Sequence, residues 1–198
     1  MIYLIRHGLT QANKENRFAG RTSEPLCTEG VSRLREVAKE LHSAAIDRIF
    51  CGPLPRTRQS AVLISQACGA AVESREGLNE IFLPHWDGLT KDEIREKFGP
   101  EYPTWLSQPA SFQVEGCETL EDVMKRAVAC VKEIASSHPA DTVLLVTHLI
   151  VARCLLLYDR KLPLARFRSI QVANGEIVPL RQFSSPSSFT VDIPVSQR

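Results

Sequence analysis

The chain has little excess of either charge: 24 lysines and arginines face 23 aspartates and glutamates, a formal net charge of +1. No overall basic field therefore favours nucleic acid or an anionic membrane as a partner. No stretch approaches the roughly 20 apolar residues that a membrane-spanning helix needs. Arg6 and His7 interrupt the N-terminal apolar run, which is then too short for a secretory signal. We expect a cytoplasmic protein with neither nucleic-acid nor membrane partners.

Familiar cysteine and glycine motifs are also missing. The six cysteines form no Cys-x-x-Cys pair and no Cys/His cluster at zinc-finger spacing, so we expect reduced thiols that pack as small apolar side chains. No Gly-x-Gly-x-x-Gly follows a predicted strand, and no Gly-Lys-Ser/Thr is present. These absences argue against a nucleotide-binding Rossmann or P-loop protein.

Short apolar runs alternate with segments of helical periodicity along most of the chain. Strands are predicted at residues 2–5, 47–51, 71–74 and 142–146. Helices are predicted at residues 28–44 (with Thr28 as the N-cap), 55–68, 91–98, 103–106, 119–136 and 149–157. Asn174-Gly175 is a strong hairpin signal between two further strands at 168–173 and 176–182, and 189–193 could add an edge strand.

This order of elements predicts an α/β fold. We expect a three-layer α/β/α arrangement with a mostly parallel sheet, helices on both faces and an antiparallel hairpin at one edge. The 198 residues suit a single domain, residues 1–198. Residues 76–118 are rich in proline, glycine and aromatic residues, and we interpret them as a small insertion that caps the site.

Polar side chains follow the ends of separate predicted strands. His7 comes after the first strand, Arg56 follows the strand that ends at Cys51, and His148 follows the strand at 142–146. Right-handed crossovers bring the carboxyl ends of parallel strands to one edge of the sheet, where ligands of open α/β sheets bind. The sequence therefore predicts that these residues meet there, with Glu80 from the loop after the third strand.

Residues of these types suit phosphoryl transfer. A neutral imidazole is a nucleophile at physiological pH, so His7 is the predicted nucleophile. Arg6 and Arg56 can each bind two phosphoryl oxygens through a planar guanidinium, and His148 can add a donor. Glu80 is the predicted general acid and then the base that activates water.

Further residues are predicted to contact phosphate or substrate. The Asn13 amide can donate to phosphate, and Gly8 lets the backbone approach the ligand closely. Arg21, Thr22 and Ser23 are assigned to the substrate side as a hypothesis.

The ordered motifs resemble those of the histidine phosphatase superfamily, in its phosphoglycerate mutase-like branch. The matching segments are LIRHG (4–8), RFAG (17–20), GPLPRTRQSA (52–61), LNE (78–80), GCET (116–119) and VTH (146–148). The resemblance covers residues 1–182. It implies a phosphorylated His7, a phosphate pocket of Arg6, Arg56 and His148, Glu80 as proton donor, and no metal or other cofactor.

Four positions depart from the family pattern, among them Cys117, which replaces a frequent glycine. Leu149 stands where glycine usually follows the second histidine, although its backbone N–H remains available to phosphate. Asn79 stands where arginine is common, and Pro84 replaces a frequent glycine and should stiffen the Glu80 loop. None of these changes removes a predicted catalytic group.

The resemblance alone does not distinguish a phosphatase from a mutase. Mutases of the family typically carry an extra basic cluster between the acid and the second histidine, whereas residues 91–97 mix both signs and indicate a solvent-facing helix. We therefore favour a metal-independent hydrolase of a small phosphorylated metabolite, with α-ribazole 5'-phosphate as a candidate. The alternatives are a phosphoglycerate mutase and a catalytically weak phosphate-ligand binding protein. A monomer or a homodimer is expected.

Overall fold

The computed structural model describes residues 1–41 and 45–183, so the edge strand predicted at 189–193 lies outside the described residues. One sheet of five strands, in the order β3-β2-β4-β1-β5, forms the centre of the structure. The strands are β1 (Ile2–Arg6), β2 (Arg48–Cys51), β3 (Ala71–Ser74), β4 (Val143–Thr147) and β5 (Ile177–Pro179). The first four are parallel, and β5 pairs antiparallel with β1. The predicted mostly parallel sheet is confirmed.

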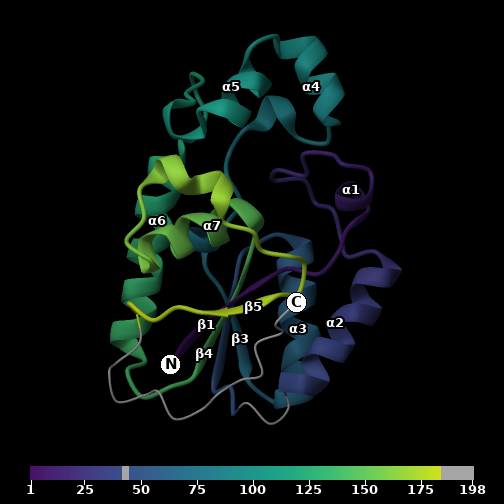
Figure 1. Cartoon of the computed structure of the whole chain (residues 1–198). Coiled ribbons are helices and arrows are strands. Elements are labelled where there is room, and N and C mark those ends of the chain that lie inside the picture. The colour runs from purple at the N-terminus through teal and green to yellow at the C-terminus, as the bar shows by residue number, and fades with distance from the viewer. Residues whose placement is uncertain (42–44, 184–198) are drawn as a thin grey trace.

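Helices cover both faces of this sheet (Figure 1). They are α1 (Gln11–Lys14), α2 (Thr28–Glu40), α3 (Pro55–Cys68), α4 (Lys91–Phe98), α5 (Glu101–Ser107), α6 (Leu120–Ser137) and α7 (Leu149–Asp159). Short 3-10 helices are η2 (Glu76–Leu78), η3 (Pro84–Trp86), η4 (Pro109–Ser111) and η5 (Leu164–Ser169). In the described residues no helix has both the length and the apolar composition to cross a membrane.

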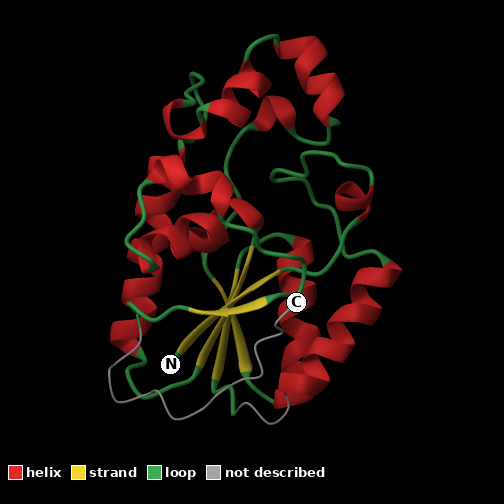
Figure 2. Cartoon of the chain, in the orientation of Figure 1, coloured by secondary structure: helices red, strands yellow, loops and turns green. Residues whose placement is uncertain are grey.

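Alternation along β1 divides the core into two layers. Tyr3 and Ile5 pack in one apolar cluster with side chains of α2 and α3, whereas Ile2 and Leu4 pack in the other with α6 and α7. Successive side chains of a strand point to opposite faces of the sheet, so each helix pair covers its own face. Figure 2 shows the strands between these helices. The predicted three-layer α/β/α fold is confirmed.

The predicted C-terminal hairpin is wrong. Residues 164–169 form η5, residues 170–173 are not a strand, and β5 pairs with β1 through Leu4↔Val178 and Ile5↔Ile177. The open edge of β1 offers β5 a longer and more apolar partner than the preceding segment does. The Asn174-Gly175 turn is present, with Gly175 at a φ of +77°, and Gly175 N–H donates to Arg6 O at 2.9 Å.

The start of α2 differs by one residue from the prediction. Thr28 is the first helical residue, and Cys27 is the N-cap, where its Sγ accepts from Gly30 N–H at 3.4 Å. A thiol is a weaker acceptor than the hydroxyl usually found there, so sequence preference pointed to the wrong neighbour. The helix ends at Glu40.

Residues 76–118 lie beyond the carboxyl ends of the parallel strands, with α4 and α5 at the top of Figure 1. Trp86 is fully buried in this segment and contacts Phe18, Trp105 and Phe112 through ring centroids 5.2–6.1 Å apart. The same aromatic group belongs to the apolar cluster of α6 and α7. The segment is therefore packed onto the main core.

We expect Trp86→Ala to lower the free energy of unfolding by about 3–5 kcal/mol, because it leaves a cavity among aromatic rings. Urea denaturation followed by far-UV circular dichroism measures this loss. Val62→Ala, at a side chain on α3 that is 47% exposed, is the control and should change stability by less than about 0.5 kcal/mol. Equal effects of the two substitutions would contradict this account of the aromatic group.

Candidate active site

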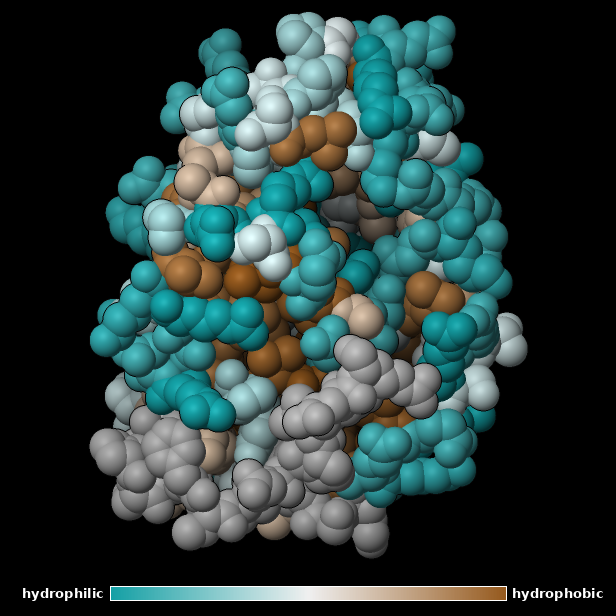
Figure 3. Space-filling model, in the orientation of Figure 1, coloured by the Kyte–Doolittle hydropathy of each residue, from teal (hydrophilic) through white to brown (hydrophobic). Residues whose placement is uncertain are grey.

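A cavity of about 520 Å³ opens at the carboxyl ends of β1 and β4. His7, Arg6, Arg56 and Glu80 all line it, so the structure brings together these four predicted site residues from separate segments. Figure 3 shows a hollow in the surface between the α4–α5 segment and the loop around α1. A cavity of this size is typical of small-molecule sites.

His7 is buried directly after β1, and its backbone is held from two sides. Its N–H donates to Thr147 O on β4 at 2.9 Å, and Asn174 Nδ2 donates to its carbonyl at 2.9 Å. The ring Nδ1 lies 2.7 Å from Gly8 O. A carbonyl oxygen only accepts, so Nδ1 carries the hydrogen and Nε2 keeps its lone pair. That tautomer leaves Nε2 as the nucleophilic atom.

The charge state of His7 also suits a nucleophile. Burial, followed by the nearby positive charges of Arg56 and Arg6, holds the pKa of His7 well below its usual value. Each of these causes disfavours imidazolium. The ring is therefore neutral at physiological pH before substrate enters.

Arg6 and Arg56 are anchored by backbone carbonyls. Arg6 Nη1 donates to Val172 O at 2.9 Å, and Arg56 Nη1 donates to Thr22 O at 3.1 Å. Arg56 is 1% exposed and sits in the first turn of α3, which begins with Pro55. Burial lowers the pKa of Arg6 to about 10 and lowers that of Arg56 as well, although both groups stay charged near neutral pH.

His148 directly follows β4, is the N-cap of α7, and lies beside His7. It is fully buried, and the two imidazole centroids are 5.3 Å apart in an edge-on arrangement. Gly52 makes this possible, because a Cβ there would lie 3.0 Å from His148 Nε2 and 2.8 Å from Leu78 O. Burial, then the charge of Arg56, keeps the pKa of His148 well below its usual value.

Several buried nitrogens around His7 lack a hydrogen-bond partner among the described residues. They are Arg6 Nε, Arg56 Nε and both ring nitrogens of His148. Buried polar atoms without partners are rare and costly in native proteins, and each such group calls for an explanation. A phosphoryl group between these side chains would accept hydrogen bonds from the Nε–H groups of Arg6 and Arg56 and from the one N–H of the neutral His148 ring.

Glu80 faces the same space from the loop after η2. It is 8% exposed, and its Oε1 accepts from Ile81 N–H at 2.9 Å. Burial raises the pKa of Glu80, against the opposing effects of that hydrogen bond and of nearby arginines. A carboxyl group with a raised pKa can carry a proton into the site.

A network behind Glu80 fixes its backbone. Arg126 donates to Asn79 O at 2.7 Å and to Glu80 O at 3.1 Å, and Arg21 Nε donates to Glu80 O at 2.8 Å. Glu118 forms ion pairs with both arginines. Arg21 thus contacts the Glu80 backbone, and it does not line the cavity.

The remaining predicted residues divide into two groups. Asn13 and Leu149 line the cavity, and Asn13 Oδ1 accepts from Thr10 N–H and Asn174 Nδ2, which points its NH₂ end toward a ligand. Gly8 lies beneath the site, where its N–H donates to Ser60 Oγ at 3.0 Å. Thr22 contributes only the carbonyl that anchors Arg56, and Ser23 is exposed and outside the cavity lining.

Four cationic side chains that line the cavity are not among the predicted site residues: Arg17, Lys91, Arg153 and Arg168. The interpretation of residues 91–97 as a solvent-facing helix is wrong for Lys91, because this first residue of α4 lines the cavity. Arg153 carried an available signal, since it is the one charged residue in the apolar run at 149–157. Arg168 lay in the segment predicted as a strand.

In the part of the chain that the structure describes, no group of three or more histidine, cysteine, aspartate or glutamate side chains could hold a metal ion. The cysteines are unpaired, and burial raises the pKa of Cys51 and Cys130 to about 11 and that of Cys154 to about 12. These thiols are protonated near neutral pH and match the expected packing role.

Comparison with known proteins gives the family. The sequence pattern of the histidine phosphatase superfamily (branch 1) matches residues 2–187. The chain belongs to the histidine phosphatase superfamily. The superfamily assignment agrees with the fold, with the paired histidines and with the buried arginines.

Relatives and structures of this superfamily cover most of the chain. It is 27% identical over 174 residues to phosphoserine phosphatase 1 of Hydrogenobacter thermophilus, covering 88% of this chain and 82% of the relative. It is 29% identical over 185 residues to a probable phosphoglycerate mutase of Shigella boydii, covering 89% and 82%. The structure of Bacillus stearothermophilus YhfR has a TM-score of 0.86 at 27% identity, covering 98% of this chain and 95% of that one. The chain is a phosphoric monoester hydrolase.

We expect Arg126→Gln to move the alkaline limb of the pH–activity profile upward. The positive charge of Arg126 lowers the pKa of Glu80, so its removal keeps the carboxyl protonated to higher pH. We also expect kcat to fall, because Glu80 loses part of its support.

Phosphate release measured from pH 4 to 9 gives both quantities. Lys125→Gln removes the same charge from the neighbouring exposed position and should leave the profile in place. An alkaline limb that stays fixed or moves downward in Arg126→Gln would contradict the positioning role.

Proposed function

We propose that this histidine phosphatase hydrolyses the phosphomonoester of a small metabolite through a phosphohistidine on His7, without a metal ion. The carrying observation is the neutral His7 ring, with its Nε2 lone pair, beside the partnerless buried nitrogens of Arg6, Arg56 and His148. These groups offer a nucleophile and the donors that a phosphoryl group needs in one place.

In the first step, His7 Nε2 attacks phosphorus while the P–O bond to the alcohol breaks. Arg6 and Arg56 hold the equatorial oxygens, whose charge they balance through the transition state. Glu80 transfers its proton to the departing oxygen, so the alcohol leaves neutral. The products of this step are phosphorylated His7 and an ionised Glu80.

In the second step, Glu80 acts as the base. It takes a proton from water as that water attacks phosphorus, and the N–P bond breaks to return neutral His7. Inorganic phosphate leaves and Glu80 is protonated again, which completes the cycle. The raised pKa of Glu80 suits both directions of proton transfer.

Residues 76–118 act in this proposal as a cap on the single domain of residues 1–198. Lys91, Tyr102 and Trp105 of this segment line the cavity, so it would select the alcohol portion of the substrate. α-Ribazole 5'-phosphate is one candidate substrate, and phosphoserine is another because a relative is named for it. A cytoplasmic location, and a monomeric or homodimeric state, stay predictions.

Phosphoryl transfer to a second hydroxyl is the other candidate activity. It is favoured by the likeness to a probable phosphoglycerate mutase and by the additional cations in the cavity. Both activities share the His7 intermediate and differ in whether water or a bound alcohol accepts the phosphoryl group.

We expect phosphate release from p-nitrophenyl phosphate in EDTA, lost at least 1,000-fold in His7→Ala because the nucleophile is gone. Rapid acid-free quenching with ³²P-labelled substrate should trap one acid-labile phosphoryl group per chain on His7. Release that EDTA abolishes, or that survives in His7→Ala, would contradict the mechanism. Conversion of 3-phosphoglycerate to 2-phosphoglycerate faster than phosphate release would favour the mutase.

We expect Glu80→Gln to lower kcat by about 10²- to 10⁴-fold on an alkyl phosphate, whose alcohol needs a proton to leave. The loss should be much smaller on 2,4-dinitrophenyl phosphate, whose phenolate leaves without one. In the wild type, alkyl phosphate turnover should decline as pH rises through the raised pKa of Glu80. Equal losses on both substrates would argue against Glu80 as the acid.

A further inference from the structure

The cavity continues beyond the groups that bind the phosphoryl oxygens. Its volume of about 520 Å³ is larger than one phosphoryl group needs. Lys91, Arg153 and Arg168 line it together with the rings of Tyr102 and Trp105. The proposed mechanism uses none of these three cations.

Positive charge dominates the cavity lining. Six lysine and arginine side chains line it, whereas Glu80 is the one carboxylate among the described lining residues. Arg6 and Arg56 serve the phosphoryl group, and Arg17 is ion-paired with Glu15 and Glu93. The other three cations form no ion pair with any carboxylate of the described residues. Like charges gathered in a partly buried space repel one another unless an anion joins them.

The two arginines are held in place by neutral groups. Arg153 is 8% exposed, its Nε donates to Ile170 O at 2.8 Å, and its guanidinium lies 5.1 Å from the centroid of Phe167. Arg168 Nη2 donates to Trp105 O at 3.0 Å, while its buried Nε has no partner among the described residues. Anchored guanidinium groups lose little entropy when they bind an anion.

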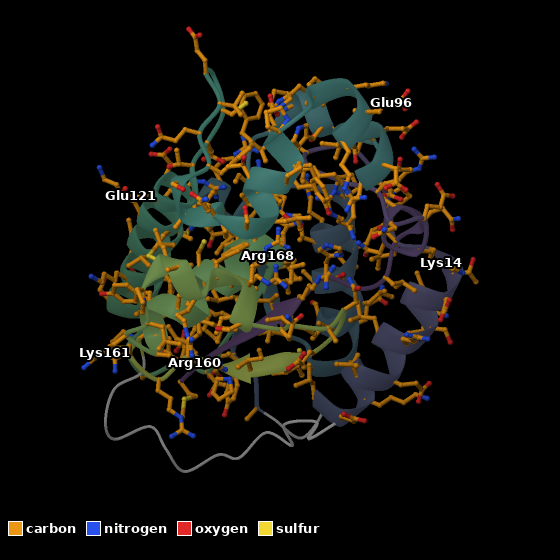
Figure 4. All side chains as sticks on the ribbon, turned by 45° about the horizontal axis from the view of Figure 1, so that its top comes forward. Lys14, Glu96, Glu121, Arg160, Lys161 and Arg168 are labelled. Carbon is orange, nitrogen blue, oxygen red and sulfur yellow. The ribbon has the colours of Figure 1, made fainter. Side chains whose placement is uncertain are left out.

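The three cations act on one another and on the phosphoryl end. Burial, followed by the charge of Arg168, lowers the pKa of Arg153 and of Lys91. Burial also lowers the pKa of Arg6, where the charge of Arg153 adds to it and that of Glu80 opposes it. In Figure 4 Arg168 lies near the middle of the molecule, whereas Lys14, Glu96, Arg160 and Lys161 lie at its rim. The positive field therefore runs from the phosphoryl site into the cavity.

We propose that Lys91, Arg153 and Arg168 form a second anion-binding subsite, so that the substrate carries a second anionic group near its scissile phosphoryl group. This inference rests on the proposed function. The shared chemistry is an oxyanion, and a carboxylate and a second phosphate are its two sources. A substrate without a second anion, such as α-ribazole 5'-phosphate, would leave these cations hydrogen-bonded to neutral groups, Lys91 to Asn16 among them, and without an ionic partner among the described residues.

Matched pairs of esters test the subsite. O-phosphoserine and O-phosphoethanolamine differ only by the carboxylate, and 1,3-propanediol bisphosphate and 3-hydroxypropyl phosphate differ only by the second phosphate. In at least one pair we expect kcat/KM to be roughly 10- to 100-fold higher for the ester with the second anionic group, because that group forms charge-assisted hydrogen bonds. The favoured pair identifies the anion.

Charge-removing variants locate the effect. Arg168→Gln and Lys91→Gln should each reduce that preference at least fivefold, mainly through KM. Arg166→Gln in η5 and Lys97→Gln in α4 remove the same charge from exposed positions of the same elements and should leave the preference unchanged. If the control variants lost as much of the preference as Arg168→Gln and Lys91→Gln, the proposed subsite would be overturned.

The outcomes also separate the two proposals. The subsite would be overturned, and the proposed function left standing, if hydrolysis depended on His7 but neither pair showed a preference. The same would follow if α-ribazole 5'-phosphate were preferred over every ester with a second anionic group. Failure to hydrolyse any ester would overturn the proposed function. In that case calorimetric titration of the wild type with the same pairs tests the subsite, and equal affinities within a pair would overturn it.

Discussion

The site depends on the parallel pairing of β1 with β4. The register sets Arg6 opposite Thr147, and His7 N–H donates to Thr147 O at 2.9 Å, so His7 and His148 leave adjacent strands at the same level. More than 130 residues separate the two histidines in the chain. A shift of this register would carry one imidazole away from the other, because each step along a strand is about 3.3 Å and reverses the side-chain direction.

Positive charge gathered around these two histidines is electrostatically unfavourable for the folded protein. Arg56 is buried and Arg6 half-buried beside two buried histidines, and Glu80 is the one carboxyl group among the described residues that line the cavity. Backbone carbonyls fix each guanidinium without neutralising it, as Val172 O does for Arg6. The result is a rigid, positively charged space in which an anion gains more than it would in water. Burial and the same positive charges hold the pKa of both imidazoles low, so both rings are neutral.

The cap and the catalytic edge are one packed unit. Trp86 joins the aromatic rings of residues 76–118 to the core of α6 and α7, and Arg126 of α6 holds the backbone that carries Glu80. Glu118, at the end of the cap segment, pairs with that arginine. Glu80, the proposed proton donor, thus belongs to the same packed segment as the cavity-lining Lys91, Tyr102 and Trp105.

Local pattern was enough to predict the four parallel strands, the three-layer fold and the convergence of His7, Arg6, Arg56 and Glu80, because apolar periodicity and strand-end polar residues are written in neighbouring positions. Tertiary structure decided the rest. β5 pairs with the edge of β1 and not with residues 168–173, because strand pairing depends on which strand edge is open in the folded sheet. The side chain of Arg21 contacts the Glu80 backbone, whereas those of Arg153 and Arg168 line the cavity. Their directions depend on which carbonyls, rings and carboxylates distant segments bring within reach, and no single stretch of sequence contains that information.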